Sequence, residues 1–216
     1  MKSFLIIGMD TFGHHLCREL AGHKCEIMIA DQREEALEDM LPYVISAKVG
    51  DCTNVEVLKT FDVPSFDACF VCMGSNFQNS LQITSLLREL GAKKVFGKAD
   101  DDVHAKFLLR NGADHVIYPE REAAKTIAVS ESSDSVFDCI PLTEDYFIYE
   151  ISPLQKWIGK SIREMDIRAA HKINILALKR GDHVLPMPQA DYVIRPDEHL
   201  LVMGHIDDIS KLIHMK

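Results

Sequence analysis

Residues 3–13 read Ser-Phe-Leu-Ile-Ile-Gly-Met-Asp-Thr-Phe-Gly, an apolar run that ends at Gly8 and is followed by Gly13 at the start of a helical pattern. Glycines at these two places allow a tight turn and close packing of a helix on a strand, as in the dinucleotide-binding turn Gly-x-Gly-x-x-Gly. The middle glycine of that pattern is Asp10 here. The stretch predicts a βαβ unit with a nucleotide site at its mouth, and Asp10 bears on which nucleotide binds.

The composition is typical of a globular protein: 216 residues, 47% of them hydrophobic, with a net charge of −9. That charge disfavours nonspecific binding to nucleic acid. No apolar stretch approaches the roughly 20 residues of a membrane span, and the run at 4–7 is too short for a signal peptide. The six cysteines are scattered, and we interpret them as small buried hydrophobic residues of a cytosolic chain.

Short β-rich apolar runs alternate with amphipathic stretches over residues 1–135. This alternation predicts crossover connections and a parallel sheet, that is, a Rossmann-like, doubly wound α/β domain. The six expected strands are Phe4–Ile7, Glu26–Ala30, Val44–Val49, Ala68–Met73, Lys94–Lys98 and His115–Tyr118.

The pattern then changes. A helical segment from about Arg121 to Ser130 leads into the polar run Glu131–Ser135, which indicates a hinge. We expect a nucleotide-binding domain over 1–135, a linker over 136–145 and a small α+β domain over 146–216. The expected elements of that last domain are strands at Tyr146–Ile151, Ile173–Lys179, His183–Leu185 and His199–Met203, short helices at Ser161–Met165 and Ile206–Ile213, and a hairpin turn at Gly181-Asp182.

In a doubly wound sheet, the turns that follow the strands face one crevice. Asp31 ends the second strand at a spacing that suits a carboxylate bound to a ribose hydroxyl, and Gln32 follows it. Later turns add Gly50-Asp51-Cys52-Thr53, Gly74-Ser75-Asn76 and Lys98. Asp51 and Thr53 would contact a base or cap the next helix. Asn76 would donate a hydrogen bond to a phosphate or cap its own helix. Lys98 is the one cation predicted at the crevice, and it is our candidate phosphate partner.

Other chemistry is weakly supported. Cys69 and Cys72 form a Cys-x-x-Cys pattern within a strand, where residues three apart point to opposite faces, about 10 Å apart. That separation exceeds disulfide reach, so we interpret both as structural. The ten histidines include no His-x-x-x-His pair, and no Gly-x-Ser-x-Gly nucleophile turn occurs. No catalytic residue is predicted.

The motifs continue in a fixed order along the chain. They are Gly8-x-x-x-Phe12-Gly13, Asp31, Gly50–Thr53, Gly74-x-Asn76, Lys98-Ala99 and Gly112–Glu120, then Gly159–Ile162, Asp166–Ala169, Ile175–Gly181 and Leu201–Gly204. In this order they resemble the RCK (regulator of potassium conductance) family of Ktr/Trk-type potassium uptake systems, with a TrkA-N domain followed by a TrkA-C domain. The resemblance covers essentially the whole chain.

The resemblance implies a cytosolic, non-catalytic gating subunit at the inner face of the cell membrane. Such subunits assemble as homo-oligomers, typically octameric rings of dimers, beneath a membrane potassium transporter subunit. The resemblance further implies ATP, ADP or NAD(H) in the Rossmann crevice and a divalent cation at Glu120. It also implies a cyclic di-AMP site in the C-terminal domain, with Arg168 as its charged contact. The residues matched to that site are Ile162, Ile167, Arg168, Asn174, Ile175 and Pro188, whose isoleucines are equally well explained as ordinary core.

The chain departs from the family turn Gly-x-Gly-Arg-Phe-Gly at Asp10 and Thr11. Asp10 places a carboxylate where backbone would approach phosphate, and like charges ~4 Å apart repel by about 4 kcal/mol at an effective dielectric constant of ~20. Thr11 replaces the arginine that would reach a terminal phosphate. A metal ion could bridge Asp10 to phosphate, a ligand with fewer phosphates could bind, or the site could be degenerate.

Three functions therefore stay open: a ligand-sensing gating subunit, an NAD-dependent oxidoreductase, and a ring subunit with a degenerate nucleotide site. The C-terminal domain is small for a substrate domain and shows no evident acid–base group, which argues against the enzyme. If charge repulsion limits binding, Asp10→Gly should strengthen the binding of nucleotide.

Overall fold

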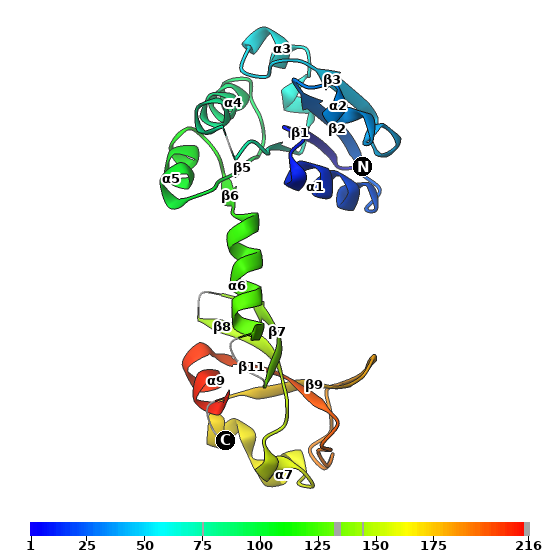
Figure 1. The fold of residues 1–216 in the computed structure, drawn as a ribbon, viewed down its shortest axis with the longest axis vertical. Coiled ribbons are helices and arrows are strands. Elements are labelled where there is room, and N and C mark those ends of the chain that lie inside the picture. Colours follow the sequence, from blue (N-terminus) through cyan, green and yellow to red (C-terminus); the bar gives the residue numbers. More distant parts are fainter. Residues whose placement is uncertain (75, 132–134, 144, 214–216) are drawn as a thin grey trace. The chain divides into compact units, whose positions relative to one another are not determined.

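The computed structural model describes residues 1–74, 76–131, 135–143 and 145–213. The predicted turn residue Ser75 and the middle of the predicted hinge, 132–134, lie outside the described residues. The chain divides into two compact units, 1–120 and 121–216 (Figure 1). Among the described helices, none combines the length and the apolar character needed to cross a lipid bilayer.

The first unit is built on a six-stranded parallel sheet in the order β3-β2-β1-β4-β5-β6, which confirms the predicted doubly wound fold. Its strands are β1 (Ser3–Ile7), β2 (Glu26–Asp31), β3 (Ser46–Val49), β4 (Ala68–Val71), β5 (Val95–Lys98) and β6 (His115–Ile117). Because β1 lies between β2 and β4, the strand order reverses beside it. In such sheets a crevice opens at this point, outside the carboxyl ends of the strands.

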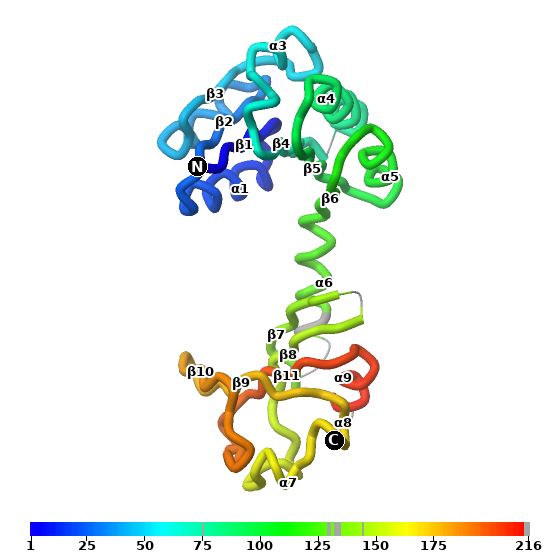
Figure 2. The backbone as a smooth tube through the Cα atoms, turned by 180° about the vertical axis from the view of Figure 1, so that it is seen from behind, coloured from blue at the N-terminus to red at the C-terminus, as the bar shows by residue number. Residues whose placement is uncertain are grey.

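Helices cover both faces of this sheet (Figures 1 and 2). They are α1 (Thr11–Ala21), α2 (Glu35–Glu38), α3 (Val55–Lys59), α4 (Phe77–Glu89) and α5 (Asp102–Arg110), with single 3-10 turns at Leu41–Tyr43 and Val63–Ser65. Alternate residues of β1 enter different cores: Leu5 packs in the cluster that holds Ile83 of α4, and Ile6 packs with Cys17 of α1. This period of two is what a strand buried on both faces requires.

The two cysteines of β4 and its following turn obey the same alternation. Cys69 belongs to the core cluster on the α4 side and Cys72 to the cluster on the α1 side. Both are buried, and burial raises the pKa of the Cys69 thiol to about 12. The structural interpretation of the Cys-x-x-Cys pattern is confirmed, since the two side chains lie on opposite faces of the sheet.

The turn between β1 and α1 is glycine-dependent. Gly8 has φ +89°, and a Cβ at Gly13 would lie 2.4 Å from the carbonyl oxygen of Gly8. Asp10 is the N-cap of α1: it has extended backbone angles, and its side chain accepts a hydrogen bond from the backbone N–H of Gly13 at 2.9 Å. The two glycines therefore let α1 start directly against the end of β1, with Asp10 at its tip.

The second unit is an antiparallel five-stranded sheet in the order β10-β9-β11-β8-β7, preceded by α6 (Pro119–Glu131). The strands are β7 (Val136–Pro141), β8 (Tyr146–Ile151), β9 (Asn174–Arg180), β10 (His183–Pro186) and β11 (His199–His205). The helices are a 3-10 turn at Gln155–Trp157, α7 (Ile162–Met165), α8 (Ile167–His171) and α9 (Ile206–Ile213). The predicted small α+β architecture and the two-residue turn at Gly181-Asp182 are confirmed.

Two boundaries differ from the prediction. The first unit ends at Glu120 rather than at 135, and the residues predicted as a linker begin with a strand, because β7 pairs with β8. A register shift between Val136 and Asp138 explains the error. It places the buried residues Val136 and Cys139 three positions apart, so the alternation that marks a strand is hidden in the sequence.

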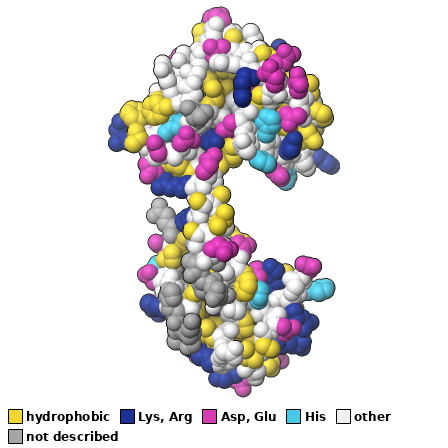
Figure 3. Space-filling model, viewed as in Figure 1, with side chains coloured by type: hydrophobic (Ala, Val, Ile, Leu, Met, Phe, Trp, Pro, Cys, Tyr) yellow, Lys and Arg dark blue, Asp and Glu magenta, His cyan; other side chains and the backbone are white. Residues whose placement is uncertain are grey.

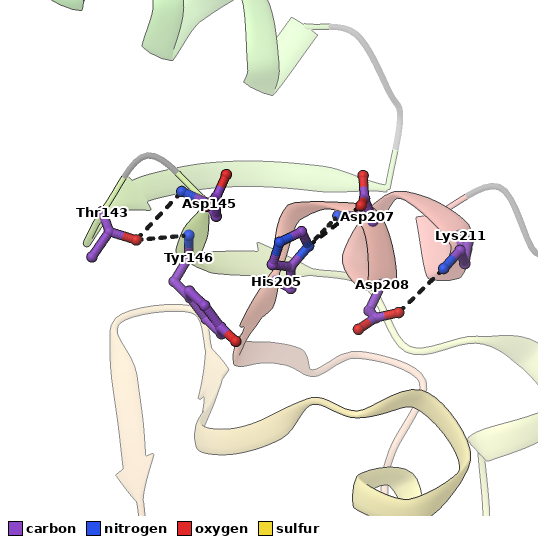
Figure 4. Close-up of polar contacts among 7 residues, drawn as sticks. All are labelled: Thr143, Asp145, Tyr146, His205, Asp207, Asp208 and Lys211. Atoms are coloured by element: carbon purple, nitrogen blue, oxygen red, sulfur yellow. Dashed lines mark hydrogen bonds and ion pairs between the residues drawn. The ribbon is translucent and has the colours of Figure 1, made fainter.

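Local hydrogen bonds hold the turns at one end of this sheet (Figure 4). Thr143 Oγ1 accepts from the backbone N–H groups of Asp145 and Tyr146, at 3.3 and 3.1 Å, and thereby holds the turn that leads into β8. At the end of β11, His205 Nδ1 accepts from the backbone N–H of Asp207 at 3.2 Å. This bond satisfies one of the free donors at the start of α9.

Gly13→Ala should destabilise the first unit, because the added methyl meets a backbone oxygen that cannot move without shifting β1 from α1. We expect a loss of about 1–3 kcal/mol in the free energy of unfolding, measured by urea titration. Gly22→Ala is the matched control at the C-cap of the same helix: Gly22 has φ −67°, the nearest contact of an added Cβ would be 3.3 Å, and the effect should stay below about 1 kcal/mol. Equal effects of the two substitutions would contradict the close contact.

Candidate functional site

A cavity of about 230 Å³ opens at the carboxyl ends of β1, β2 and β4. Its lining includes these sequence-predicted residues: Gly8, Asp10, Asp31, Gln32, Cys52 and Asn76. It also includes Gly50 of the predicted turn after the third strand, and three residues that were not predicted as site residues: Met9, Arg33 and Met73. Arg33 was missed because an arginine just past a strand looks like any solvated surface residue in the sequence.

Asp31 is held firmly at the end of β2, with its side chain only 10% exposed. Its Oδ2 accepts from the backbone N–H of Met9 at 2.7 Å, and its Oδ1 accepts from the N–H and Nε of Arg33 at 2.9 and 3.3 Å. Burial alone would raise the pKa of Asp31, but these hydrogen bonds outweigh it and the pKa is lowered. The carboxylate is therefore ionised, and it keeps spare lone pairs on the cavity side for a ribose hydroxyl.

The turn after β3 contributes backbone and a thiol rather than its polar side chains. Asp51 Oδ1 accepts from both the N–H and the Oγ1 of Thr53, at 2.9 and 2.7 Å, and neither residue is among those that line the cavity. The expectation that Asp51 or Thr53 caps the next helix is wrong, because Asn54 caps α3. Cys52 does line the cavity, and burial raises the pKa of its thiol to about 12, so it is unreactive.

Of the two interpretations of Asn76, the structure shows the cap. Asn76 Oδ1 accepts from the backbone N–H of Asn79 at 3.1 Å at the start of α4, while the residue also lines the cavity. Gly74 precedes it at a crowded place, since a Cβ there would lie 2.3 Å from Asp100 Oδ1 and 3.2 Å from Lys98 Cε. Gly74 therefore leaves room for the side chains of Asp100 and Lys98.

Asp10 and Lys98 form an ion pair, which neither motif predicted. Lys98 Nζ lies 2.8 Å from Asp10 Oδ2 and 3.0 Å from Glu120 Oε1, and the lysine side chain is only 8% exposed. The expected free cation at the crevice is thus bound between two carboxylates. The sequence could not reveal this contact, because it joins the ends of β1 and β5 and the start of α6.

The pKa values of this group follow from its geometry. Burial alone would lower the pKa of Lys98, but the hydrogen bonds and charges of Asp10 and Glu120 outweigh it and raise the pKa. The hydrogen bond from Lys98 lowers the pKa of Glu120, whose side chain is 70% exposed. Lys98 and Glu120 are therefore both charged at neutral pH.

A second hollow of about 650 Å³ shares Met9, Asp10 and Arg33 with the cavity. Its other lining residues are Thr11, His14, His15 and Arg18. Of the remaining residues of the predicted turn, Phe12 packs against the core on the α1 side and Gly13 is buried. Both thus serve the packing of α1.

In the second unit, all six residues matched to a cyclic di-AMP site line one pocket of about 410 Å³. Arg168 and Asn174 are joined by a hydrogen bond from Nε to Oδ1 at 2.7 Å, and Ile162 and Ile175 are half-buried. Ile167 is buried, as its interpretation as core predicted. Three further lining residues were not singled out: Arg163, Asp166 and Ala190.

The lining of the crevice suits the ribose and base of a nucleotide better than its phosphates. The placed carboxylate of Asp31 and the apolar walls from Met9 and Met73 suit a ribose and a base. Two donors at the phosphate end, Lys98 Nζ and the Gly13 N–H, are already bonded to Asp10. Within the described residues, no three His, Cys, Asp or Glu side chains gather as a metal site would require.

Comparisons with known proteins show the family of this chain. The TrkA-N domain family matches residues 4–119 and the TrkA-C domain family matches residues 146–215. The Ktr system potassium uptake protein C of Bacillus subtilis (strain 168) is 37% identical over 97% of this chain and 95% of its own length. The chain belongs to the Ktr family of RCK proteins. The Ktr system potassium uptake protein A of the same organism is 32% identical to this RCK protein, over the same shares of the two chains.

Solved structures show the same fold. The GsuK RCK domain aligns with 99% of this RCK protein at a TM-score of 0.68 and 18% identity, and the GsuK channel bound to NAD aligns with 98% at a TM-score of 0.68 and 18% identity. The chain spans 47% and 38% of those two longer chains. At this identity the likeness is one of fold alone.

Asp31→Asn should destabilise the first unit by about 1–3 kcal/mol at pH 7. The amide group of Asn would face the N–H of either Met9 or Arg33 with its own NH2 group, so that one buried donor would lose its acceptor. The folded pKa of Asp31 is lowered from 3.8, so its contribution is complete above pH 3.8 and is lost as the pH falls below that value. The difference in urea stability between wild type and variant should therefore shrink at pH 3. Asp39→Asn, at a half-exposed ion pair with Arg18, is the control and should cost less than about 1 kcal/mol. A pH-independent difference would contradict this role of Asp31.

Proposed function

We propose that this RCK protein is the cytoplasmic, ligand-sensing gating subunit of a bacterial potassium uptake system. The observation that carries the proposal is the full-length similarity to Ktr potassium uptake proteins, combined with two separate pockets, one in each unit. A gating subunit needs only that its ligands bind two states with different affinities. It needs no catalytic group, and none is evident around either pocket.

The proposed partner is a membrane potassium transporter subunit, and the proposed assembly is a homo-oligomeric ring built from dimers. The Ktr relatives are named as parts of a potassium uptake system, which supports the partner. A nucleic-acid partner is not proposed. The net charge is −9, and Lys and Arg side chains are interspersed with Asp and Glu on the face shown in Figure 3.

The proposed ligand of the first unit is an adenine nucleotide, with its ribose at Asp31 and its base along the apolar wall. The GsuK channel, which shares this fold, has been solved bound to NAD. For this chain the support comes from the cavity itself, which lies at the reversal of strand order between β1 and β4 and has an ionised carboxylate at the end of β2. A divalent cation at Glu120 stays a prediction, and it would have to replace Lys98 as the partner of that carboxylate.

The proposed ligand of the second unit is cyclic di-AMP. The pocket has the half-buried side chains of Ile162 and Ile175 beside the guanidinium of Arg168. Apolar side chains can pack against the flat face of a base, and a guanidinium suits a phosphate oxygen. Asn174 orients Arg168 through the bond from Nε, which leaves the terminal nitrogens of the guanidinium to face a ligand.

An NAD-dependent oxidoreductase is the less supported alternative. The cavity lining includes glycines, methionines and unreactive thiols, and both of its carboxylates, Asp10 and Asp31, already accept hydrogen bonds from donors within the protein. Neither is therefore a candidate acid. A ring subunit with a degenerate nucleotide site is favoured by one observation, the Asp10–Lys98 pair at the phosphate end.

Co-expression of this chain with a Ktr-type membrane subunit should restore growth at low external potassium in a bacterial strain that lacks its own potassium uptake systems. The membrane subunit alone, and this chain alone, are the controls and should support little growth. Potassium uptake measured on the same cells should rise only with both chains. NADH-dependent turnover by the purified protein, without any effect on uptake, would overturn the proposal in favour of an enzyme.

Arg168→Ala should weaken cyclic di-AMP binding by at least about tenfold in isothermal titration calorimetry, because it removes the charged contact of the pocket. Arg180→Ala removes an exposed guanidinium of the same unit, which lies 3.9 Å from Asp197 and outside this pocket. That control should bind as the wild type does. Equal binding by both variants would show that the pocket is not the cyclic di-AMP site.

A further inference from the structure

The carboxylate of Asp10 occupies two of the donors that a ligand phosphate would use at this end of the crevice. Its Oδ1 accepts from the backbone N–H of Gly13 at 2.9 Å, in the first turn of α1, and its Oδ2 accepts from Lys98 Nζ at 2.8 Å. Free N–H groups at a helix start and a nearby cation are the usual phosphate-binding elements. Here one protein carboxylate binds one of these N–H groups, that of Gly13, and the cation, Lys98.

The positive charge of Lys98 is already balanced by carboxylates of the protein. Glu120 Oε1 lies 3.0 Å from the same Nζ, so the lysine is shared by two carboxylates and the three side chains sum to one negative charge. Asp100 lies close by, since Asp100 Oδ1 and Lys98 Cε both approach the position that a Cβ of Gly74 would take. Lys98 is 8% exposed, so water screens these interactions only partly.

The backbone of Asp10 is also unstrained in this position. It has φ −77° and ψ −176°, which are ordinary angles for an N-cap, and its backbone carbonyl accepts the first helical hydrogen bond, from His14. A phosphate that took its place would have to break the cap and the ion pair together. The arrangement is therefore a stable feature of the folded protein rather than a strained one.

We propose that Asp10 is a tethered anion that replaces a ligand phosphate, so that the crevice selects an adenine nucleoside or monophosphate over the diphosphate and triphosphate. This rests on the proposed function, in which the crevice binds an adenine nucleotide. The ribose and base bind as proposed at Asp31 and the apolar wall. Each further phosphate then approaches the Asp10–Lys98–Glu120 group and meets a net negative charge.

The test compares the dissociation constants of adenosine, AMP, ADP and ATP by calorimetry, without divalent cations and at constant ionic strength. Wild type should bind adenosine or AMP at least as tightly as ADP or ATP. Asp10→Gly and Asp10→Asn should each shift the ratio of ADP affinity to adenosine affinity toward ADP by about tenfold, a change of about 1.4 kcal/mol. Asp10→Asn keeps an oxygen to cap α1, and glycine is itself a tolerated N-cap, so at least one variant should fold.

Asp101→Asn is the matched control. Asp101 is the N-cap of α5, accepts from the backbone N–H of His104 at 2.7 Å, and is not among the residues that line the cavity. The same loss of one negative charge should there leave the ADP-to-adenosine ratio unchanged. A shift equal to that of Asp10→Asn would mean that overall charge, and not the tethered carboxylate, sets the preference, and would overturn the proposal.

Other outcomes also decide the matter. If wild type prefers ADP or ATP over adenosine by tenfold or more and Asp10→Gly leaves that ratio unchanged, the inference is wrong while the proposed function stands. If Mg²⁺ strengthens ADP binding in wild type and this gain disappears in Asp10→Gly, Asp10 is a metal ligand and the inference is again wrong. If no variant binds any of the four compounds, the proposed nucleotide function fails, and the inference fails with it.

Discussion

The contact between the end of β1 and the start of α1 sets the geometry of the whole first unit. A side chain at Gly13 would meet the carbonyl oxygen of Gly8 at 2.4 Å, and Gly8 itself has a φ that favours glycine. With both glycines in place, the first turn of α1 faces the crevice at the reversal of strand order. The position of Asp10 at the tip of α1, and the hydrogen bond from the Met9 N–H to Asp31, both follow from that contact.

The two carboxylates that line the crevice differ in what they leave open. Asp31 binds the N–H groups of Met9 and Arg33 and keeps acceptor capacity toward the cavity, so it stiffens the turn while it can still bind a hydroxyl. Both oxygens of Asp10 already accept hydrogen bonds, one from the Gly13 N–H and the other from Lys98 Nζ, at the end of the crevice where a phosphate would lie. Under the proposed function, a ligand in the crevice would compete with bonds that the protein already makes with itself.

Lys98 also connects the crevice to the helix that leads out of the first unit. Its ammonium bonds Asp10 at the tip of α1 and Glu120 in the first turn of α6, and the second unit begins at the next residue, Arg121. The second unit has its own pocket, formed by α7, α8, β9 and the segment after β10. The chain thus has one candidate ligand pocket within each compact unit.

The sequence by itself determined the parts that depend on local patterns. The alternation of apolar runs and helices predicted the six-stranded parallel sheet, and the glycine pattern with Asp31 predicted the nucleotide crevice at the ends of β1 and β2. Strand β7 was missed because a register shift hides its period of two. Only the tertiary structure decided the role of Asp10 and Lys98, which are 88 residues apart in the chain. Charge and residue type show that such groups can attract or repel a phosphate, but a hydrogen bond at 2.8 Å depends on how the strands are ordered in space, and that order brings the two side chains together.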